Sequence, residues 1–216
     1  GIPATPIRRM QPADPAGAAQ RRKAAEAKTQ RRAALTGMLA PALAIQNTVQ
    51  GPANLTLASL AGKVVVLDFT ATWCGPCRRV IPHLIAKQKQ YAGKLQVLAV
   101  SRFYGYGADY RDGASGKIVR KLDAETELTV NAAFAKQYRI DYPVVLVDHP
   151  TMSTQYGVAG IPTLFVIGKD GKVAGHVVGA GPSSQAKVDA LIEKALAGGP
   201  LSPTGNETPS RGIDRS

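Results

Sequence analysis

Residues 64–77 read Val-Val-Val-Leu-Asp-Phe-Thr-Ala-Thr-Trp-Cys-Gly-Pro-Cys, and Cys74 and Cys77 are the only two cysteines of the chain. The apolar run that precedes them is typical of a β-strand covered on both faces. The residues that follow favour a helix. Two thiols three positions apart can close a disulfide, open it and pass it to another protein. The stretch therefore predicts a redox site where a buried strand meets a helix.

The two cysteines are expected to have different roles. Cys74 lies where the strand ends and the helix begins, and the free amides and dipole of a helix N-terminus stabilise a thiolate. The pKa of such a thiol falls from about 8.5 to between about 3.5 and 7.5, so Cys74 is expected to attack. Cys77, one turn into the helix, is expected to be more shielded. It is placed to attack the mixed disulfide and release the partner.

The cysteine pair also fits a stable structural disulfide or half of a zinc site. A structural zinc site takes about four ligands, and the other soft ligands are His83, His149 and His176, which form no second paired motif. A disulfide across two intervening residues closes a very small loop and restricts the unfolded chain little. The redox interpretation is therefore favoured, and no metal or other cofactor is expected.

The composition is that of a protein with room for one core. The chain has 216 residues, of which 44% are hydrophobic and 19% are charged. No stretch reaches the roughly 18 apolar residues of a membrane span. The sequence begins at Gly1 rather than at a methionine, which is compatible with the removal of an export signal or anchor. An anchor of that kind would hold the protein near a membrane.

The positive charge is spread unevenly along the chain. The net charge is +12, and residues 1–50 carry eight Lys or Arg against two acidic residues. This basic, Ala/Arg-rich N-terminal arm favours helix over 18–35, with few large apolar residues to bury. Such an arm can contact nucleic acid or anionic lipid. Because aromatic residues are sparse in it, it offers no platform for stacked bases. We expect a solvated helix or tail and no nucleic-acid partner.

A compact domain is expected over residues 51–198, followed by a disordered tail over 199–216. Strands are predicted over 55–57, 63–69, 95–100, 144–147, 163–167 and 173–178, and helices over 76–91 with a kink at Pro82, over 125–138, over 151–156 and from Ser183 or Ser184 to about 197. The last two strands form a hairpin. Helices join the early strands, which are therefore expected to be parallel. The predicted class is α/β.

Two separate motifs resemble those of the thioredoxin superfamily. Residues 68–77 look like its active-site strand and turn, and Gly160-Ile161-Pro162-Thr163, about 85 residues further on, matches its second signature. The resemblance covers roughly residues 51–198. It implies a thioredoxin-like fold, in which a central mixed sheet is flanked by helices.

An insertion narrows the resemblance to one branch of the superfamily. Residues 101–143 contain more chain than a minimal thioredoxin needs, including the predicted helix. This order of motifs is similar to that of the TlpA-like thiol–disulfide oxidoreductases, which are usually exported bacterial proteins. The resemblance implies a periplasmic or other extracytoplasmic location. A chain without cysteines beyond the pair also suits an oxidising compartment.

The resemblance assigns roles to residues near the cysteines. Trp73 is expected to shield the site and shape the docking face. Gly75 and Pro76 match reducing members of the superfamily. Asp68 matches the buried acid that accepts or relays the Cys77 proton. Independently of the resemblance, a carboxyl group on a buried strand is desolvated, so its pKa should rise towards neutrality. A polar residue that is simply hydrogen-bonded at a strand end is the alternative for Asp68.

The second motif is expected to form the substrate side of the site. Pro162 is cis and faces the disulfide in relatives, so it carries over as the wall on which the substrate lies. The backbone of Ile161 is then expected to pair with an extended partner peptide. Thr163 completes this substrate-binding loop. The tyrosines over 104–110 either edge the groove or pack in the core.

The leading functional hypothesis is a thiol–disulfide oxidoreductase that acts as a reductase on disulfide-bearing or dithiol partner proteins. A separate electron donor would recharge it. A thiol peroxidase is an alternative, because peroxiredoxins share the fold. They have a hydroxyl residue three places before the attacking cysteine, however, and this chain has Ala71 there. A third alternative is a binding or assembly module in which the basic arm provides the function.

Overall fold

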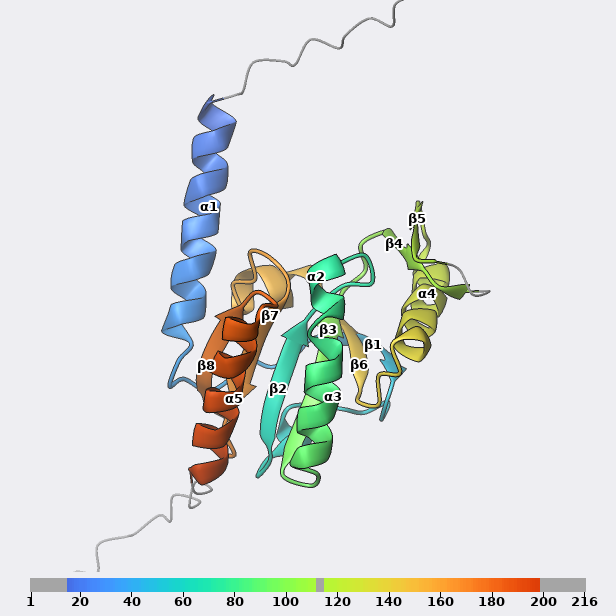
Figure 1. The fold of residues 1–216 in the computed structure, drawn as a ribbon. Coiled ribbons are helices and arrows are strands. Elements are labelled where there is room, and N and C mark those ends of the chain that lie inside the picture. Colours follow the sequence, from blue (N-terminus) through green and yellow to red (C-terminus); the bar gives the residue numbers. More distant parts are fainter. Residues whose placement is uncertain (1–14, 112–114, 199–216) are drawn as a thin grey trace, which may run out of the picture.

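The structure is a computed structural model and describes residues 15–111 and 115–198 (Figure 1). The tail predicted over 199–216 lies outside the described residues.

A six-stranded mixed sheet forms the centre of the fold, in the order β1-β6-β3-β2-β7-β8. Its strands are β1 (Ile45–Gln50), β2 (Val64–Phe69), β3 (Leu95–Ser101), β6 (Val144–Val147), β7 (Thr163–Ile167) and β8 (Val173–Val178). The strands β2, β3 and β6 run parallel to one another, whereas β1, β7 and β8 are antiparallel to their neighbours. The predicted thioredoxin-like α/β fold is confirmed.

The sheet carries a hydrophobic core on each face. Alternate residues of β2 point to opposite faces, as a strand requires. Val64 and Val66 pack with α3 (Ile81–Gln90) and α5 (Pro182–Ala197) on the face turned toward the viewer in Figure 1. Val65, Leu67 and Phe69 face the other core, which is covered by η1 (Ala58–Leu60), η3 (Thr151–Gln155) and the chain after the first helix. Since all six residues of β2 are buried, the predicted all-apolar central strand is confirmed.

The insertion forms a separate unit at one edge of the sheet. It contains the hairpin of β4 (Tyr106–Asp109) and β5 (Lys117–Arg120), followed by α4 (Ala124–Gln137). The side chain of Asp123 accepts a hydrogen bond from the N–H of Thr126 and caps α4. The predicted helix in the insertion is confirmed. The hairpin was not predicted, because β5 is largely exposed and lacks an alternating apolar pattern.

The helix predicted over 76–91 is two helices, α2 (Gly75–Arg78) and α3, separated at Arg79 and Val80. Pro82 therefore lies in the first turn of α3 and does not kink a continuous helix. A proline is tolerated there because the first turn has no internal acceptor for its missing N–H.

The predicted strand over 55–57 is wrong. Thr56 and Ser59 instead exchange backbone-to-side-chain hydrogen bonds around the start of the short helix η1. The last helix begins at Pro182, earlier than either predicted serine, with Gly181 at its N-cap.

The sheet extends further toward the N-terminus than residue 51. Strand β1, at residues 45–50, pairs with β6 at the edge of the sheet. Its residues Ile-Gln-Asn-Thr-Val-Gln are mostly polar and half-exposed, so no hydrophobic run marked it as a strand.

The N-terminal arm contains α1 (Pro15–Ala34), which projects away from the domain and touches it only near its C-terminal end (Figure 1). Two guanidinium groups dock this end: Arg31 donates to the carbonyl of Gln155 and Arg32 donates to the carbonyl of Gly157. The predicted basic helix is confirmed, but its last turns are packed on the domain. Within the described ranges, no helix is both long and apolar enough to cross a membrane.

Candidate active site

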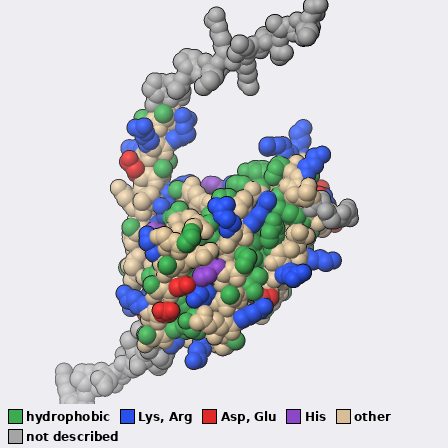
Figure 2. All heavy atoms as spheres, viewed as in Figure 1, with side chains coloured by type: hydrophobic (Ala, Val, Ile, Leu, Met, Phe, Trp, Pro, Cys, Tyr) green, Lys and Arg blue, Asp and Glu red, His purple; other side chains and the backbone are tan. Residues whose placement is uncertain are grey.

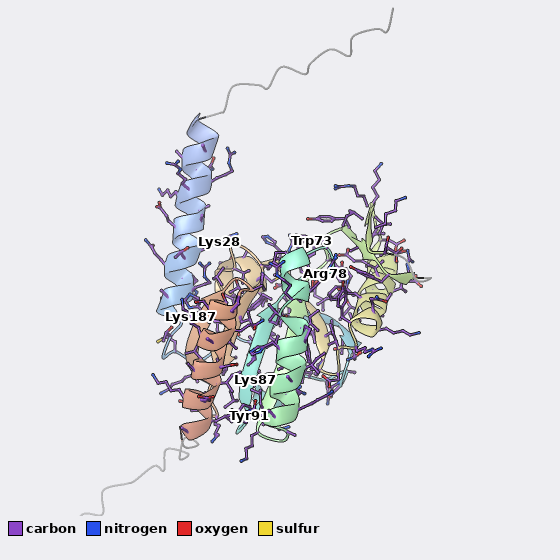
Figure 3. The ribbon with its side chains drawn as sticks, in the orientation of Figure 1. Lys28, Trp73, Arg78, Lys87, Tyr91 and Lys187 are labelled. Atoms are coloured by element: carbon purple, nitrogen blue, oxygen red, sulfur yellow. A yellow bond between two sulfur atoms is a disulfide. The ribbon has the colours of Figure 1, made fainter. Side chains whose placement is uncertain are left out.

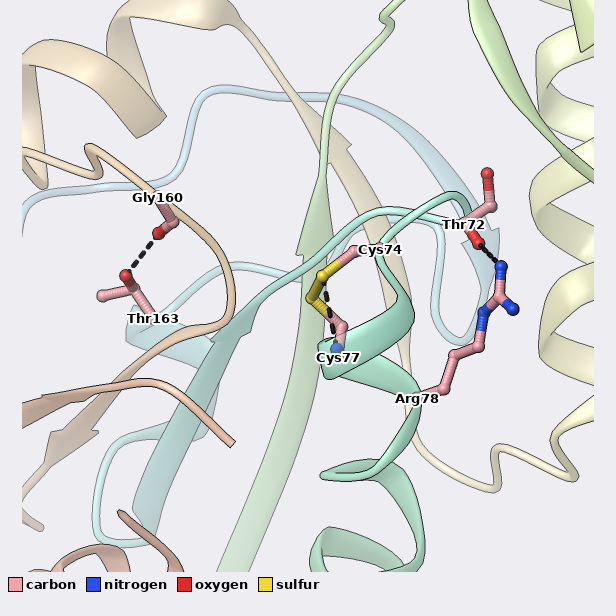
Figure 4. Close-up of a disulfide and its surroundings, with 6 residues drawn as sticks. All are labelled: Thr72, Cys74, Cys77, Arg78, Gly160 and Thr163. Carbon is pink, nitrogen blue, oxygen red and sulfur yellow. Dashed lines mark hydrogen bonds between the residues drawn. A yellow bond between two sulfur atoms is a disulfide. The ribbon is translucent and has the colours of Figure 1, made fainter. Parts of the chain in front are cut away.

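The cysteine pair lies where β2 meets α2, as expected. Cys74 is the N-cap residue of α2, and Cys77 lies in the same short helix. The two sulfur atoms form a disulfide, and the N–H of Cys77 donates to the sulfur of Cys74 at 3.2 Å (Figure 4). Both side chains are buried, and Cys77 is completely inaccessible. An N–H directed at Cys74 favours negative charge on its sulfur once the disulfide is reduced.

Asp68 provides a desolvated carboxyl group on the strand that leads to the cysteines. It lies in register with Ala99 of β3 and Leu164 of β7, in the middle of the sheet. Neither carboxyl oxygen has a hydrogen-bond partner among the described residues. Because burial disfavours the charged form, the pKa of Asp68 rises to about 7. The shift has the direction expected from the sequence, and it gives a group that can take up or release a proton near neutral pH.

Tyr142 adds a second buried polar group. Its hydroxyl oxygen also has no hydrogen-bond partner among the described residues. Burial raises the pKa of Tyr142, and the negative charge of Asp68 raises it further. The phenol therefore stays neutral, and Asp68 is the group in this part of the core that titrates near neutral pH.

The second motif lies at the start of β7, the strand that pairs with β2. The Ile161–Pro162 peptide bond is cis. The hydroxyl of Thr163 donates to the carbonyl of Gly160 at 2.7 Å, which fixes the turn before β7 (Figure 4). The side chain of Ile161 packs against the cluster of Ala71 and the two cysteines. The structure thus brings the two motifs together, although 85 residues separate Cys77 from Pro162 in the sequence.

Trp73 covers the disulfide from the insertion side. Its ring packs against the same cluster as Ile161 and is stacked on Tyr106 at 5.5 Å between ring centroids. Tyr104 meets the Trp73 ring edge-on at 5.3 Å. Tyr110, in contrast, packs in the core against Phe134. The tyrosines were predicted either to edge the groove or to pack in the core, and each prediction is correct for different residues. Tyr104 and Tyr106 lie at the edge of the site, and Tyr110 belongs to the core.

Hydrogen bonds order the start of the insertion and join it to the active-site turn. The buried carboxylate of Glu127 on α4 accepts hydrogen bonds from the backbone N–H groups of Tyr104, at 2.7 Å, and Gly105, at 2.8 Å. The hydroxyl of Thr72 accepts from the N–H of Ala108 at 3.1 Å. Sequence reasoning missed Glu127, because an acidic residue in a polar helix gives no sign that it turns inward.

A groove of about 220 Å³ lies beside the disulfide, lined by Trp73, Tyr104 and Ile161, and Lys28 of α1 reaches it. A larger cavity of about 450 Å³ lies at the opposite end of β2, between η1 and the β7–β8 turn. The smaller groove is the one relevant to the redox site, because three of its lining residues, Trp73, Tyr104 and Ile161, pack against the cysteine cluster.

The histidines lie away from the sulfur atoms or on the rim of the groove. His83 contacts the carboxylate of Asp189 at 2.8 Å. His176 lies on β8, where burial and the charge of Arg32 lower its pKa. His149 lines the groove. Over residues 15–111 and 115–198, no group of three or more His, Cys, Asp or Glu side chains could hold a metal ion.

Comparison with known proteins agrees with this geometry. The Redoxin family profile matches residues 35–192. The thioredoxin-like protein YneN of Bacillus subtilis (strain 168) is 31% identical over 143 residues, which are 66% of this chain and 71% of YneN. A thiol-disulfide oxidoreductase ResA of Bacillus cereus is 32% identical over 127 residues, 58% of this chain. The chain spans only 61% of the length of that ResA.

A solved structure has the same fold. The crystal structure of a putative thiol:disulfide interchange protein DsbE from Chlorobium tepidum superposes with a TM-score of 0.55 at 31% identity. The match covers 74% of this chain and 97% of that one. With the fold, the paired motifs and the insertion in agreement, the chain belongs to the Redoxin family, as a TlpA-like member of the thioredoxin superfamily.

Proposed function

We propose that this protein is a thiol–disulfide oxidoreductase that reduces disulfides in partner proteins. One observation carries the proposal: the Cys74–Cys77 disulfide follows directly on the strand that holds the desolvated carboxyl group of Asp68, and Trp73 and Ile161, which pack against the cysteines, line an open groove. A purely structural disulfide needs neither of these neighbours. The names of the relatives, which include thiol-disulfide oxidoreductase and thiol:disulfide interchange protein, support the same activity.

The first step is attack by Cys74. In the dithiol form, the Cys74 thiolate is stabilised by the N–H of Cys77 at the start of α2. It attacks one sulfur of the partner's disulfide, and the sulfur–sulfur bond of the partner breaks. The second partner sulfur leaves as a thiolate and takes a proton from solvent. The product is a mixed disulfide between Cys74 and the partner.

The second step is resolution by Cys77. Its thiol must lose a proton in a buried place, and Asp68 is the desolvated carboxylate that accepts it. The Cys77 thiolate then attacks the sulfur of Cys74, which closes the Cys74–Cys77 disulfide and releases the first partner sulfur as a thiolate that takes a proton from solvent, and Asp68 returns its proton to solvent. Two electrons have passed to the partner. A separate dithiol donor must return them before the next cycle.

The partner is held by residues on both sides of the disulfide. We assign the docking surface to six residues: Trp73, Gly75, Pro76, Ile161, Pro162 and Thr163. Among the described residues, neither the N–H nor the C=O of Ile161 has a hydrogen-bond partner. This backbone is therefore free to pair with an extended segment, as in strand addition.

Insulin reduction and thiol trapping test the proposal. The reduced protein should precipitate insulin chains, Cys74→Ser should lose this activity by more than about a thousandfold, and Cys77→Ser should accumulate mixed disulfides. Equal insulin reduction by Cys74→Ser and the parent would refute the mechanism.

The redox potential of the pair, measured against glutathione, decides the direction of electron transfer: a value well above that of the glutathione couple would indicate an oxidant rather than a reductase. Rapid consumption of hydrogen peroxide without insulin reduction would favour the peroxidase alternative.

We infer an extracytoplasmic location, because TlpA-like proteins are usually exported and the chain has no cysteine outside the pair. Fractionation of the native host, with the protein followed by antibody, tests this inference. Recovery of the full-length protein in the cytoplasmic fraction alone would contradict it.

A further inference from the structure

The groove beside the disulfide has a cationic rim that the proposed mechanism does not use. Its wall near the sulfur atoms is apolar, formed by Trp73 and Ile161. Its lining also includes Lys28 and Arg102, and no aspartate or glutamate among the described residues lines it. Lysine and arginine side chains are positively charged at neutral pH. The part of the groove nearest the cysteines is thus apolar, and its outer part is cationic.

Lys28 reaches this rim because α1 is docked rather than free. The carbonyl of Lys28 lies against Gly157, where even a Cβ atom would collide with it, and Gly157 has φ +62°. The buried guanidinium of Arg32 donates to the carbonyl of Gly157 at 2.6 Å, and Arg31 donates to that of Gln155 at 2.9 Å. These contacts fix the last turns of α1 beside the groove. Figure 3 shows Lys28 and Trp73 at the same end of the domain.

Neither rim cation is neutralised within the described residues. No ion pair to Lys28 or Arg102 is present there. Arg102 stacks over the ring of Tyr104, 4.0 Å from its centroid, and donates one hydrogen bond to the carbonyl of Phe103. Stacking on a ring fixes the guanidinium in place while leaving other N–H groups free to bind an anion. Figure 2 shows further Lys and Arg side chains along α1 and over the same end of the domain.

We propose that this rim selects partner proteins whose target cysteine lies in an acidic segment, and that Lys28 of the N-terminal helix is a specificity-determining residue. The proposal rests on the proposed function, since it names the class of partner for the same site. An extended segment that pairs with the free backbone of Ile161 runs along the groove. Its carboxylates then meet Lys28 and Arg102, whereas lysines at those places would be repelled.

Disulfide-cyclised peptides test this selectivity. The three peptides have the same disulfide-closed loop. It is flanked by aspartates in the first peptide, by asparagines in the second and by lysines in the third. The full chain, reduced and freed of reductant, is mixed with each peptide at low salt, and acid-quenched samples are separated by chromatography. We expect the aspartate peptide to be reduced about fivefold to tenfold faster than the lysine peptide, the range that a few exposed charge pairs provide. Lys28→Glu should bring this ratio to about one, and Lys28→Gln should give an intermediate value.

Lys23→Glu is the matched control. It changes the net charge by the same amount on the same helix, but Lys23 is exposed and does not line the groove. It should keep the parental ratio. Equal rates for all three peptides, or an equal loss of preference in Lys23→Glu and Lys28→Glu, would overturn the proposal. So would Lys28-dependent binding of phosphatidylserine vesicles without any peptide preference, since that result assigns the rim to a lipid surface. If no peptide and no insulin is reduced, the proposed function itself fails.

Discussion

The two sides of the disulfide differ in almost every physical respect. On the inner side, Asp68 and Tyr142 lie in the middle of the core, with polar atoms that have no partner among the described residues. On the outer side, Trp73, Lys28 and Arg102 surround an open groove with charge at its rim. A charge is costly on the inner side and well solvated on the outer side.

This difference separates two tasks. A proton can be moved near neutral pH on the inner side because a dry environment raises the pKa of a carboxyl group. A partner can be chosen on the outer side because a solvated cation attracts or repels without needing to be buried. Under the proposed function, we expect the inner side to govern the rate of the chemical step and its pH dependence, and the outer side to govern which protein receives the electrons.

The largest expected effect concerns stability on the inner side. The pKa of Asp68 is about 7 in the folded protein and 3.8 in the unfolded reference, so the folded state holds the proton more tightly. Stability therefore falls as pH rises through this window, by up to roughly 4 kcal/mol at about 1.4 kcal/mol per unit. Asp68→Asn removes this dependence. In denaturant melts of the oxidised proteins, the free energy of unfolding of Asp68→Asn, taken relative to that of the parent, should rise between about pH 4 and pH 8.

Asp123→Asn serves as a control of opposite sign. Asp123 caps α4 at the surface, and the N–H of Thr126 lowers its pKa. The stability that ionised Asp123 contributes is therefore present at neutral pH and is lost as the pH falls. A parallel pH profile for the parent and Asp68→Asn would show that the carboxyl is not desolvated, and the contrast between the two sides would then collapse.

The next effect concerns the chemical step. Without a proton acceptor for Cys77, resolution of the mixed disulfide should slow by about a hundredfold near pH 7 in Asp68→Asn. The deficit should shrink at higher pH, where the thiol ionises without help. Stopped-flow measurement of partner release from a preformed mixed disulfide isolates this step. If attack by Cys74 slows while release does not, the assigned role of Asp68 is wrong.

A smaller effect is expected where α1 docks. Gly157→Ala places a methyl group against the carbonyl of Lys28 and should lower the free energy of unfolding by about 1–3 kcal/mol. Gly62→Ala is the matched control: φ is also positive there, at +83°, but nothing lies within 4 Å of the new atom. Thermal melts should therefore show a larger loss for Gly157→Ala. The preference for acidic peptides should fall in this variant alone, because Lys28 is displaced.

The smallest effect is that of salt on the outer side. At about 0.5 M salt the screening length falls to roughly 4 Å, so the acidic-peptide preference should fall toward one. The pH profile of mixed-disulfide release, which depends on a buried group, should hardly change. If salt changed the acidic-peptide preference and the pH profile of release to the same extent, the electrostatics of the two sides would not be independent.

The sequence predicted the inner side better than the outer side. A nearly all-apolar run over 64–69, interrupted only by the acid Asp68, identifies a buried strand and a desolvated carboxyl without further information. The second motif, Gly160–Thr163, was predicted to face the cysteines only through a family resemblance, because 85 residues separate Cys77 from Pro162.

The cationic rim of the outer side could not be predicted, because its contacts follow no periodic pattern. Lys28 is one of several basic residues in a polar helix, and only the docking of α1 on Gly157 distinguishes it from Lys23. The edge strand β1 and the inward carboxylate of Glu127 were missed for the same reason. Polar residues in such places look solvated until the fold supplies their partners.

Trp73 also makes the redox state of the site measurable by fluorescence. It is the only tryptophan of the 216 residues, and its indole packs in the cluster that contains both cysteines. Because disulfides quench the emission of a nearby indole, we expect reduction of the Cys74–Cys77 bond to increase the tryptophan fluorescence, which can be recorded without an added dye. Each turnover, and each partner that displaces water from the ring, can then be followed in real time on the unmodified chain.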